Sequence, residues 1–236
     1  MSATDLSRPL STRVEAFSDA IFAITITLLV LEIKRPPFDE PHLGKHLLQG
    51  WPDYVAFIVS FLYIGVLWLN HHAAFARIRR VDLTLNWINL VILGTTALLP
   101  FSTGVLAGAF GEDAAAGNRE AAVALYGFVS MLMALAWIPL FVHLGRHPEL
   151  LERDEDRALL AVQRSRPIVG VVSYGAAAVL GWLVSPYVGL ALFGWMIVYH
   201  AITSEGLQAN PLARALAPAG RPREVVNDPD VVREQA

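Results

Sequence analysis

Long apolar runs, separated by short charged stretches, dominate the pattern of hydrophobic and polar positions along the chain. Uncharged runs cover residues 54–76, 83–111, 121–145 and 167–204. About 20 helical residues cross a hydrocarbon core about 30 Å thick, so each run is long enough to span a membrane. The last run contains "SPYVG" at 185–189, where Pro186 and Gly189 predict a turn between two helices. The pattern thus predicts five membrane helices beyond residue 50.

The first apolar stretch, "RVEAFSDAIFAITITLLVLEIK" from Arg13 to Lys34, predicts a sixth helix. A helix over residues 13–33 is about 31 Å long, which is enough to cross the same core. The predicted fold class is therefore all-α, a polytopic membrane protein with six transmembrane helices.

Composition supports a membrane protein. Of the 236 residues, 55% are hydrophobic and 17% charged, and the mean hydropathy is +0.47. This places the bilayer among the expected partners. The net charge of −3 argues against a nucleic-acid binder, which needs a basic surface. The absence of cysteine excludes disulfides and thiolate metal sites.

The lysines and arginines predict the orientation, because cytoplasmic loops carry the excess of these residues. If alternate loops face the same side, all of the 18 basic residues share the side of the N-terminus, except Lys34, Arg35, Lys45 and Arg119. We therefore expect a multi-pass protein of the cell membrane with both termini in the cytoplasm.

Polar residues inside the predicted helices need an explanation, since a charged group at the bilayer centre costs at least about 2.5 kcal/mol. Ser18 and Asp19 lie in the first helix. One interpretation is that they sit near its cytoplasmic end, where they are solvated or paired with an arginine. Another is a hydrogen-bonded cluster with Arg13 and with polar residues of the second helix, which ends "LWLNHHAAF" and contains Asn70, His71 and His72.

Enzymatic chemistry finds no support in the sequence. The chain has no GxSxG, no HExxH and no neighbouring pair of intramembrane carboxylates. Adjacent histidines on a helix diverge by about 100°, so His71 and His72 make a poor metal site. We expect no catalytic residue, no metal and no cofactor.

The second half of the first helix carries an aliphatic stripe. Ile24, Thr27, Leu28 and Leu31 follow the i, i+3, i+4, i+7 spacing of one helix face. From the residues alone, a packing seam between helices is the favoured interpretation of this stripe, and the wall of a pore is the alternative.

Three motifs resemble the transmembrane protein 175 family of potassium channels. Arg13, Phe17, Ser18 and Asp19 match its R-x-x-x-F-S-D signature. "WLNHHAAF" in the second helix and "NLVILGTTALLPF" in the third follow in the same order. The resemblance covers residues 13–102; beyond residue 115 only hydropathy and helix number are similar.

This resemblance implies a six-helix subunit of a homotetramer, in which the first helix lines a central pore for potassium and other monovalent cations. It implies a hydrophobic constriction at Ile24, Leu28 and Leu31, with Thr27 as a polar selectivity layer. No TVGYG-like filter occurs, so we expect modest selectivity. The signature network comprises Arg13, Phe17, Ser18 and Asp19, with Trp68, Asn70, His71 and His72 as partners on the second helix.

The predicted organisation is a cytoplasmic N-terminus at 1–12, a transmembrane channel domain at 13–209 and a disordered cytoplasmic tail at 210–236. The alternative function is a secondary transporter or a proton-coupled cation pathway, in which Asp19 and the histidines act as a relay. An integral-membrane enzyme acting on lipid is disfavoured because its motifs are missing.

Overall fold

The computed structural model describes residues 8–36, 41–111, 114–115, 117–152 and 163–203. The tail predicted at 210–236 and residues 1–7 of the predicted N-terminal segment lie outside this part. The elements are α1 (Arg8–Leu28), the 3-10 helix η1 (Leu29–Glu32), α2 (Leu43–Gln49), α3 (Trp51–Phe75), α4 (Leu83–Thr96), α5 (Leu99–Ala109), α6 (Asn118–Arg146), the 3-10 helix η2 (Pro148–Leu150), α8 (Ser165–Leu183) and α9 (Pro186–Thr203).

The predicted fold class is confirmed. Six helical spans are long and apolar enough to cross a membrane, and in the described segments only one isolated bridge, between Ile78 and Leu151, has β geometry. A turn between two helices is present, but it lies at Val184 and Ser185 rather than over 185–189, because α9 begins at Pro186 and includes Gly189. Hydropathy alone thus located the spans.

Two spans differ in detail from the regular helices that the sequence predicts. The third breaks between α4 and α5, because Pro100 has no N–H to donate to the carbonyl of Thr96. The first begins at Arg8, within the predicted N-terminal segment, and tightens into η1 after Leu28. In a 3-10 helix residues three apart eclipse one another, so Leu31 lies directly beyond Leu28 along the helix.

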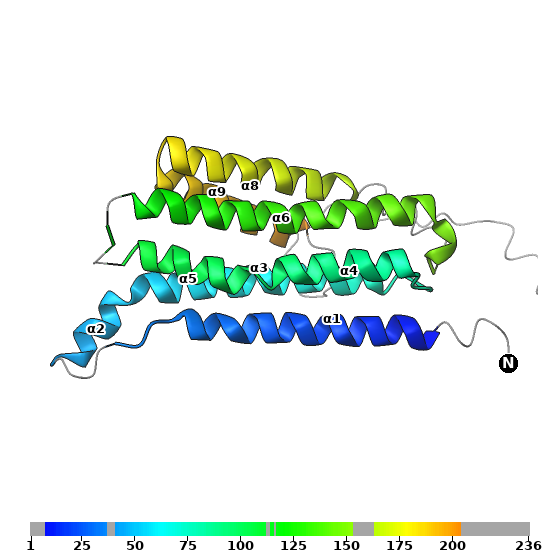
Figure 1. The fold of residues 1–236 in the computed structure, drawn as a ribbon, viewed down its shortest axis with the longest axis horizontal. Helices are drawn as coiled ribbons and strands as arrows, with labels where there is room; N and C mark the ends of the chain where they lie inside the picture. Colours follow the sequence, from blue (N-terminus) through cyan, green and yellow to red (C-terminus); the bar gives the residue numbers. More distant parts are fainter. Residues whose placement is uncertain (1–7, 37–40, 112–113, 116, 153–162, 204–236) are drawn as a thin grey trace, which may run out of the picture.

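The helices stack in layers (Figure 1). α1 forms one side of the bundle, α3 with α4 and α5 forms the middle, and α6 with α8 and α9 forms the other side. α2 lies at the end of the bundle where η1, α5 and the turn between α8 and α9 also lie. This arrangement leaves α1 covered on one side only.

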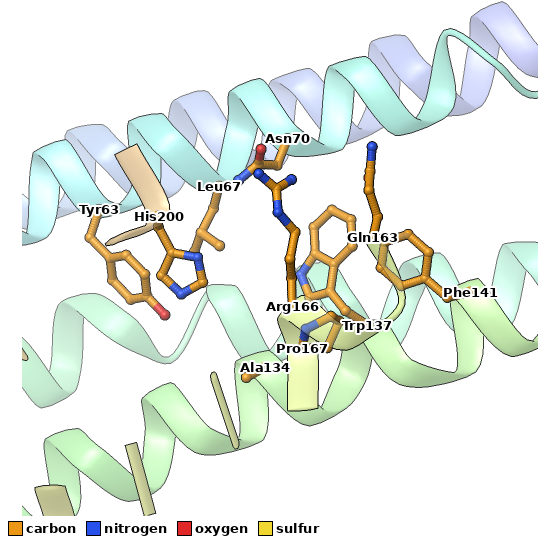
Figure 2. Close-up of a pocket in the computed structure, with 10 residues that line it drawn as sticks. All are labelled: Tyr63, Leu67, Asn70, Ala134, Trp137, Phe141, Gln163, Arg166, Pro167 and His200. Carbon is orange, nitrogen blue, oxygen red and sulfur yellow. The ribbon is translucent and has the colours of Figure 1, made fainter. Parts of the chain in front are cut away.

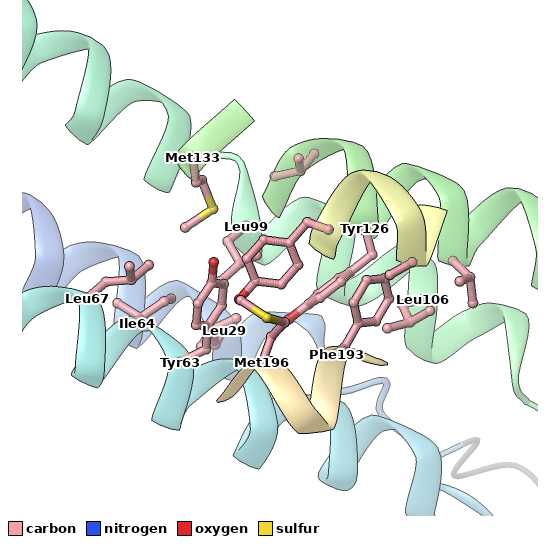
Figure 3. Close-up of a cluster of buried hydrophobic side chains, with 14 of the residues drawn as sticks. Leu29, Tyr63, Ile64, Leu67, Leu99, Leu106, Tyr126, Met133, Phe193 and Met196 are labelled. Carbon is pink, nitrogen blue, oxygen red and sulfur yellow. The ribbon is translucent and has the colours of Figure 1, made fainter. Parts of the chain in front are cut away.

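Large side chains from all layers meet in the core (Figure 3). Leu29, Tyr63, Met133 and Phe193 are at most 3% exposed and belong to one buried cluster. Within it, Ser60 hydrogen-bonds both the Thr103 hydroxyl, at 2.8 Å, and the Tyr126 hydroxyl, at 3.2 Å. These bonds join α3, α5 and α6, so the middle layer is tied to the outer one through polar as well as apolar contacts.

Asp82 fixes the start of α4. Its Oδ1 accepts a hydrogen bond from the Leu85 N–H at 2.7 Å, and its Oδ2 lies 2.8 Å from His143 Nε2 on α6. Partial burial raises the pKa of the Asp82 carboxyl, but the Leu85 N–H and His143 stabilise the carboxylate more strongly, so the pKa is lowered overall. The carboxylate therefore anchors α4 to α6.

We expect Asp82→Ala to lower the free energy of unfolding by about 1 kcal/mol at pH 7, because an N-cap contributes about that much. Asp82→Asn keeps a cap and should lose less. Since the folded pKa is depressed, the carboxylate's contribution is present above about pH 4 and is lost as the pH falls through the folded pKa. Thermal unfolding in detergent at pH 7 and pH 3 measures this. If wild type and Asp82→Asn differ in free energy of unfolding by as much at pH 3 as at pH 7, the prediction is wrong.

Candidate functional site

Helix α1 presents two different faces. Ser18, Phe22, Thr25 and Leu29 lie on its inner face and are at most 1% exposed. They contact the middle layer of the bundle, and the hydroxyls of Ser18 and Thr25 donate to carbonyls one turn back, at 2.8 Å each. The helix is thus held firmly along one face only.

Asn89 of α4 joins α1 to α3. Its Nδ2 donates to Ser18 Oγ at 2.9 Å, and its Oδ1 lies 2.8 Å from His71 Nε2. All three residues are at most 2% exposed. The His71 ring stacks on Phe75 with ring centroids 4.1 Å apart, which fixes its plane. Because these hydrogen bonds have no water to replace them inside a membrane, they set the rotation of α1 against its neighbours.

The sequence analysis missed Asn89, although a signal was present. Asn89 is an amide in the middle of the apolar run "NWINLVILG", and a buried amide in a membrane helix needs partners. Sequence spacing did not reveal which helix supplies them, since α1, α3 and α4 meet only in the fold.

Asp19 provides a second link between α1 and α3, in addition to the one through Asn89. Its Oδ1 accepts a hydrogen bond from Trp68 Nε1 at 2.8 Å. His72 packs against the Trp68 ring with centroids 6.0 Å apart, while His71 points to Asn89. The two imidazoles thus have different neighbours, and no group of three ligating side chains is found in the described ranges.

The remaining signature residues do not join this network within one subunit. Arg13 is exposed, and Phe17 is 50% exposed. Asn70 faces a cavity of about 60 Å³ between α3, α6, α8 and α9, where it lies near Arg166 and His200 (Figure 2). Its Oδ1 is buried without a hydrogen-bond partner among the described residues. Asn70 therefore faces away from Ser18 and Asp19.

The aliphatic stripe occupies the uncovered face of α1. Ile24 is 52% exposed, Leu28 41% and Leu31 72%, and Thr27 is exposed between them. Thr27 Oγ1 donates its proton to the Ile24 carbonyl at 2.8 Å. The oxygen lone pairs of Thr27 are thereby left outward, where a hydroxyl accepts a donor or coordinates a cation.

The end of α1 is held by α5 and α3. The Glu32 side chain fills the space that a Cβ on Gly104 would occupy. Two residues further, the Lys34 backbone N–H donates to Asp53 Oδ2 at 3.0 Å. The helical segment that carries the stripe is therefore held at both ends. Asn89 and Trp68 contact the residues before the stripe, and Gly104 and Asp53 contact the residues after it.

Comparison with known proteins is consistent with this geometry. The family model "Endosomal/lysosomal potassium channel TMEM175" matches residues 13–100. A protein of Streptomyces collinus, named as a potassium channel, is 39% identical over 89% of this chain and 98% of its own length. The chain belongs to the TMEM175 family.

Two further similarities extend the TMEM175 assignment. A potassium channel of Chamaesiphon minutus is 34% identical over 72% of this chain and 86% of its own length. The crystal structure of a lysosomal potassium-selective TMEM175 homolog from the same organism shares 30% identity, with a TM-score of 0.73, over 84% of this chain and 99% of that one. The similarity therefore reaches well beyond the residues of the TMEM175 model.

Proposed function

We propose that this TMEM175 chain is one subunit of a homotetrameric, potassium-permeable cation channel of the cell membrane. Its relatives in Streptomyces collinus and Chamaesiphon minutus are named as potassium channels. Both relatives are channels, in agreement with the expectation that the chain is not an enzyme. The excess of basic residues at the N-terminal end of α1 supports cytoplasmic termini.

One observation carries the proposal. The stripe Ile24, Thr27, Leu28 and Leu31 is uncovered on a helix whose opposite face is fixed by buried polar contacts. In a fourfold assembly with α1 nearest the axis, the stripes of four subunits face one another. Rings of Ile24, Leu28 and Leu31 then form a hydrophobic constriction that excludes water when narrow and conducts when wider.

Thr27 supplies the polar layer in this pore. Its outward lone pairs replace part of the hydration shell of K⁺, the permeant ion, without a ring of fixed charge. Such a layer gives modest selectivity among monovalent cations. No cofactor enters the proposal.

The signature residues position the pore helix in this proposal. Ser18 and Asp19 fix the rotation of α1 through Asn89 and Trp68. Arg13 and Phe17 lie on the same uncovered side as the stripe, so we assign their role to contacts between subunits. We assign Asn70 and His72 no role in the pore, because Asn70 faces the cavity between α3, α6, α8 and α9 and His72 packs on Trp68.

Ion flux across the membrane of liposomes tests the function directly. With potassium inside and sodium outside, purified protein should produce a potassium current that does not saturate at millimolar concentration and needs no proton gradient. Cross-linking in the same liposomes should yield tetramers. A saturating flux that requires a proton gradient, and that Asp19→Asn abolishes, would favour the transporter instead; no flux from an intact tetramer would contradict the channel.

A further inference from the structure

Two adjoining cavities open at the end of the bundle where α1 finishes. The first, the apolar slot, has a volume of about 210 Å³ and lies between α3, α5, α6 and α9. The second, the basic basin, has a volume of about 610 Å³ and is lined by α2, the segment after η1, and the ends of α3 and α5. Pro52 and Ala107 line both, so the slot and the basin adjoin.

The slot is suited to a hydrocarbon chain. Its walls are almost entirely apolar; of the residues that line it, Ser60 and Tyr126 carry hydroxyls, which are hydrogen-bonded to each other, and Trp51 carries an indole N–H. Trp51 at its rim is 59% exposed, and Ser60 lies nine residues further along α3, so the slot is about 13 Å deep. An apolar cavity of about 150 Å³ already binds a small hydrocarbon such as benzene in preference to water.

The basin carries the opposite chemistry. Lys34, Arg35 and Lys45 line it and form no ion pair with any carboxylate in the part of the chain that the structure describes; His46 also contributes. The carboxylate that lines the basin, Asp53, is buried and accepts the Lys34 backbone N–H. The basin therefore favours an anionic group.

We propose that slot and basin together bind one anionic phospholipid, with an acyl chain in the slot and its phosphate beside Lys34, Arg35 and Lys45. A phospholipid carries both chemistries in one molecule, an apolar chain and an anionic headgroup. α9 lines the slot with the exposed Gly194, and this helix lies on the side of the bundle away from α1 (Figure 1). With α1 toward the pore axis, this side faces the bilayer.

The bound lipid also contacts elements that hold the end of α1. Leu106 and Ala107 of α5 line the slot, while Gly104 of the same helix contacts Glu32. Lys34 lies two residues after the end of η1 and packs on Gly108. Lipid binding should therefore bias the position of the stripe and hence the flux; this regulatory part rests on the proposed channel function, whereas binding itself does not.

Photo-cross-linking tests the binding. Purified protein in nanodiscs receives phosphatidylglycerol that carries a diazirine in the middle of one acyl chain, and labelled residues are mapped by mass spectrometry. We expect labels at Val55, Val59, Leu106 and Leu190. Unlabelled phosphatidylglycerol should compete at least about fivefold better than phosphatidylcholine, since one basic residue near an anionic lipid contributes about 1 kcal/mol. Inorganic phosphate should not compete.

Matched variants separate the two halves of the site. Gly194→Leu adds a side chain at a residue that lines the slot, where a Cβ has no other atom within 4 Å, and should reduce slot labelling at least fivefold; Gly65→Leu, whose Cβ is equally free but lies elsewhere, should not. Lys34→Gln with Lys45→Gln should remove the preference for phosphatidylglycerol. Arg79→Gln with Arg146→Gln, exposed at the other end of the bundle, should leave it unchanged.

Three results would overturn the lipid site. These are slot labelling that Gly194→Leu leaves intact, equal protection by inorganic phosphate, and cross-links from slot residues to a second copy of the chain, which would make the slot a subunit contact. Labelling is read without any flux, so a failed lipid site and a failed channel are distinguished. If both hold, Gly194→Leu should also change potassium flux.

Discussion

Leu28→Ala should raise potassium flux at least about tenfold, since widening a hydrophobic constriction restores water to it and hydrated pores conduct. The variant removes most of an aliphatic side chain from each of four subunits at the proposed narrow point. Leu28 is 41% exposed in the subunit, so its truncation leaves the core of the bundle intact. Stopped-flow flux into liposomes, normalised to the amount of tetramer, measures the change.

Val30 provides the control for this result. It is 53% exposed, close to the 52% of Ile24, yet it lies in η1 and off the stripe. Ile24→Ala should therefore raise the flux as Leu28→Ala does, and Val30→Ala should leave it near the wild-type value. If all three variants raise the flux equally, general loosening of α1 explains the effect, and the constriction is not formed by the stripe.

Asn89→Leu should destabilise the subunit by about 2 kcal/mol, because it leaves the buried Ser18 and His71 without their shared partner. The same change frees the rotation of α1, so the ratio of potassium to sodium flux should shift as well. Thermal unfolding in detergent measures the first effect, and bi-ionic flux in liposomes measures the second.

Asn70→Leu is the matched control. Asn70 is also an asparagine in a membrane helix, but its Oδ1 has no partner in the described residues and it faces a cavity away from α1. This variant should change the stability by less than about 1 kcal/mol and leave selectivity unchanged. If Asn70→Leu lowers the stability as much as Asn89→Leu does, then replacing any amide in these helices destabilises the subunit, whatever the partners of that amide.

Hydropathy predicted the six spans because a bilayer imposes one requirement on every helix that crosses it, about 20 apolar residues. The break at Pro100 was visible in the sequence as a residue without an N–H, yet the third span was predicted as one helix. The change to a 3-10 helix after Leu28 has no comparable local signal. It moves Leu31 over Leu28 and so alters the shape of the proposed constriction.

The network around Ser18 shows where prediction from sequence ended. A helical wheel places Ser18 on one face of α1, but a face has several neighbours, and the partner turned out to be Asn89 of α4 rather than Asn70 of α3. His71 lies beside this cluster and is linked to Ser18 through Asn89. Arg13 was expected in the cluster and lies on the exposed side of the subunit.

The sequence by itself determined the number of membrane spans, the all-α class and the stripe of Ile24, Thr27, Leu28 and Leu31, because each depends on periodicity and hydropathy within one helix. Only the tertiary structure decided that the stripe is the uncovered face of α1, that Asn89 fixes the helix, and that slot and basin adjoin. These features depend on contacts between helices, and in a membrane those contacts are selected by packing and a few hydrogen bonds rather than by local sequence pattern.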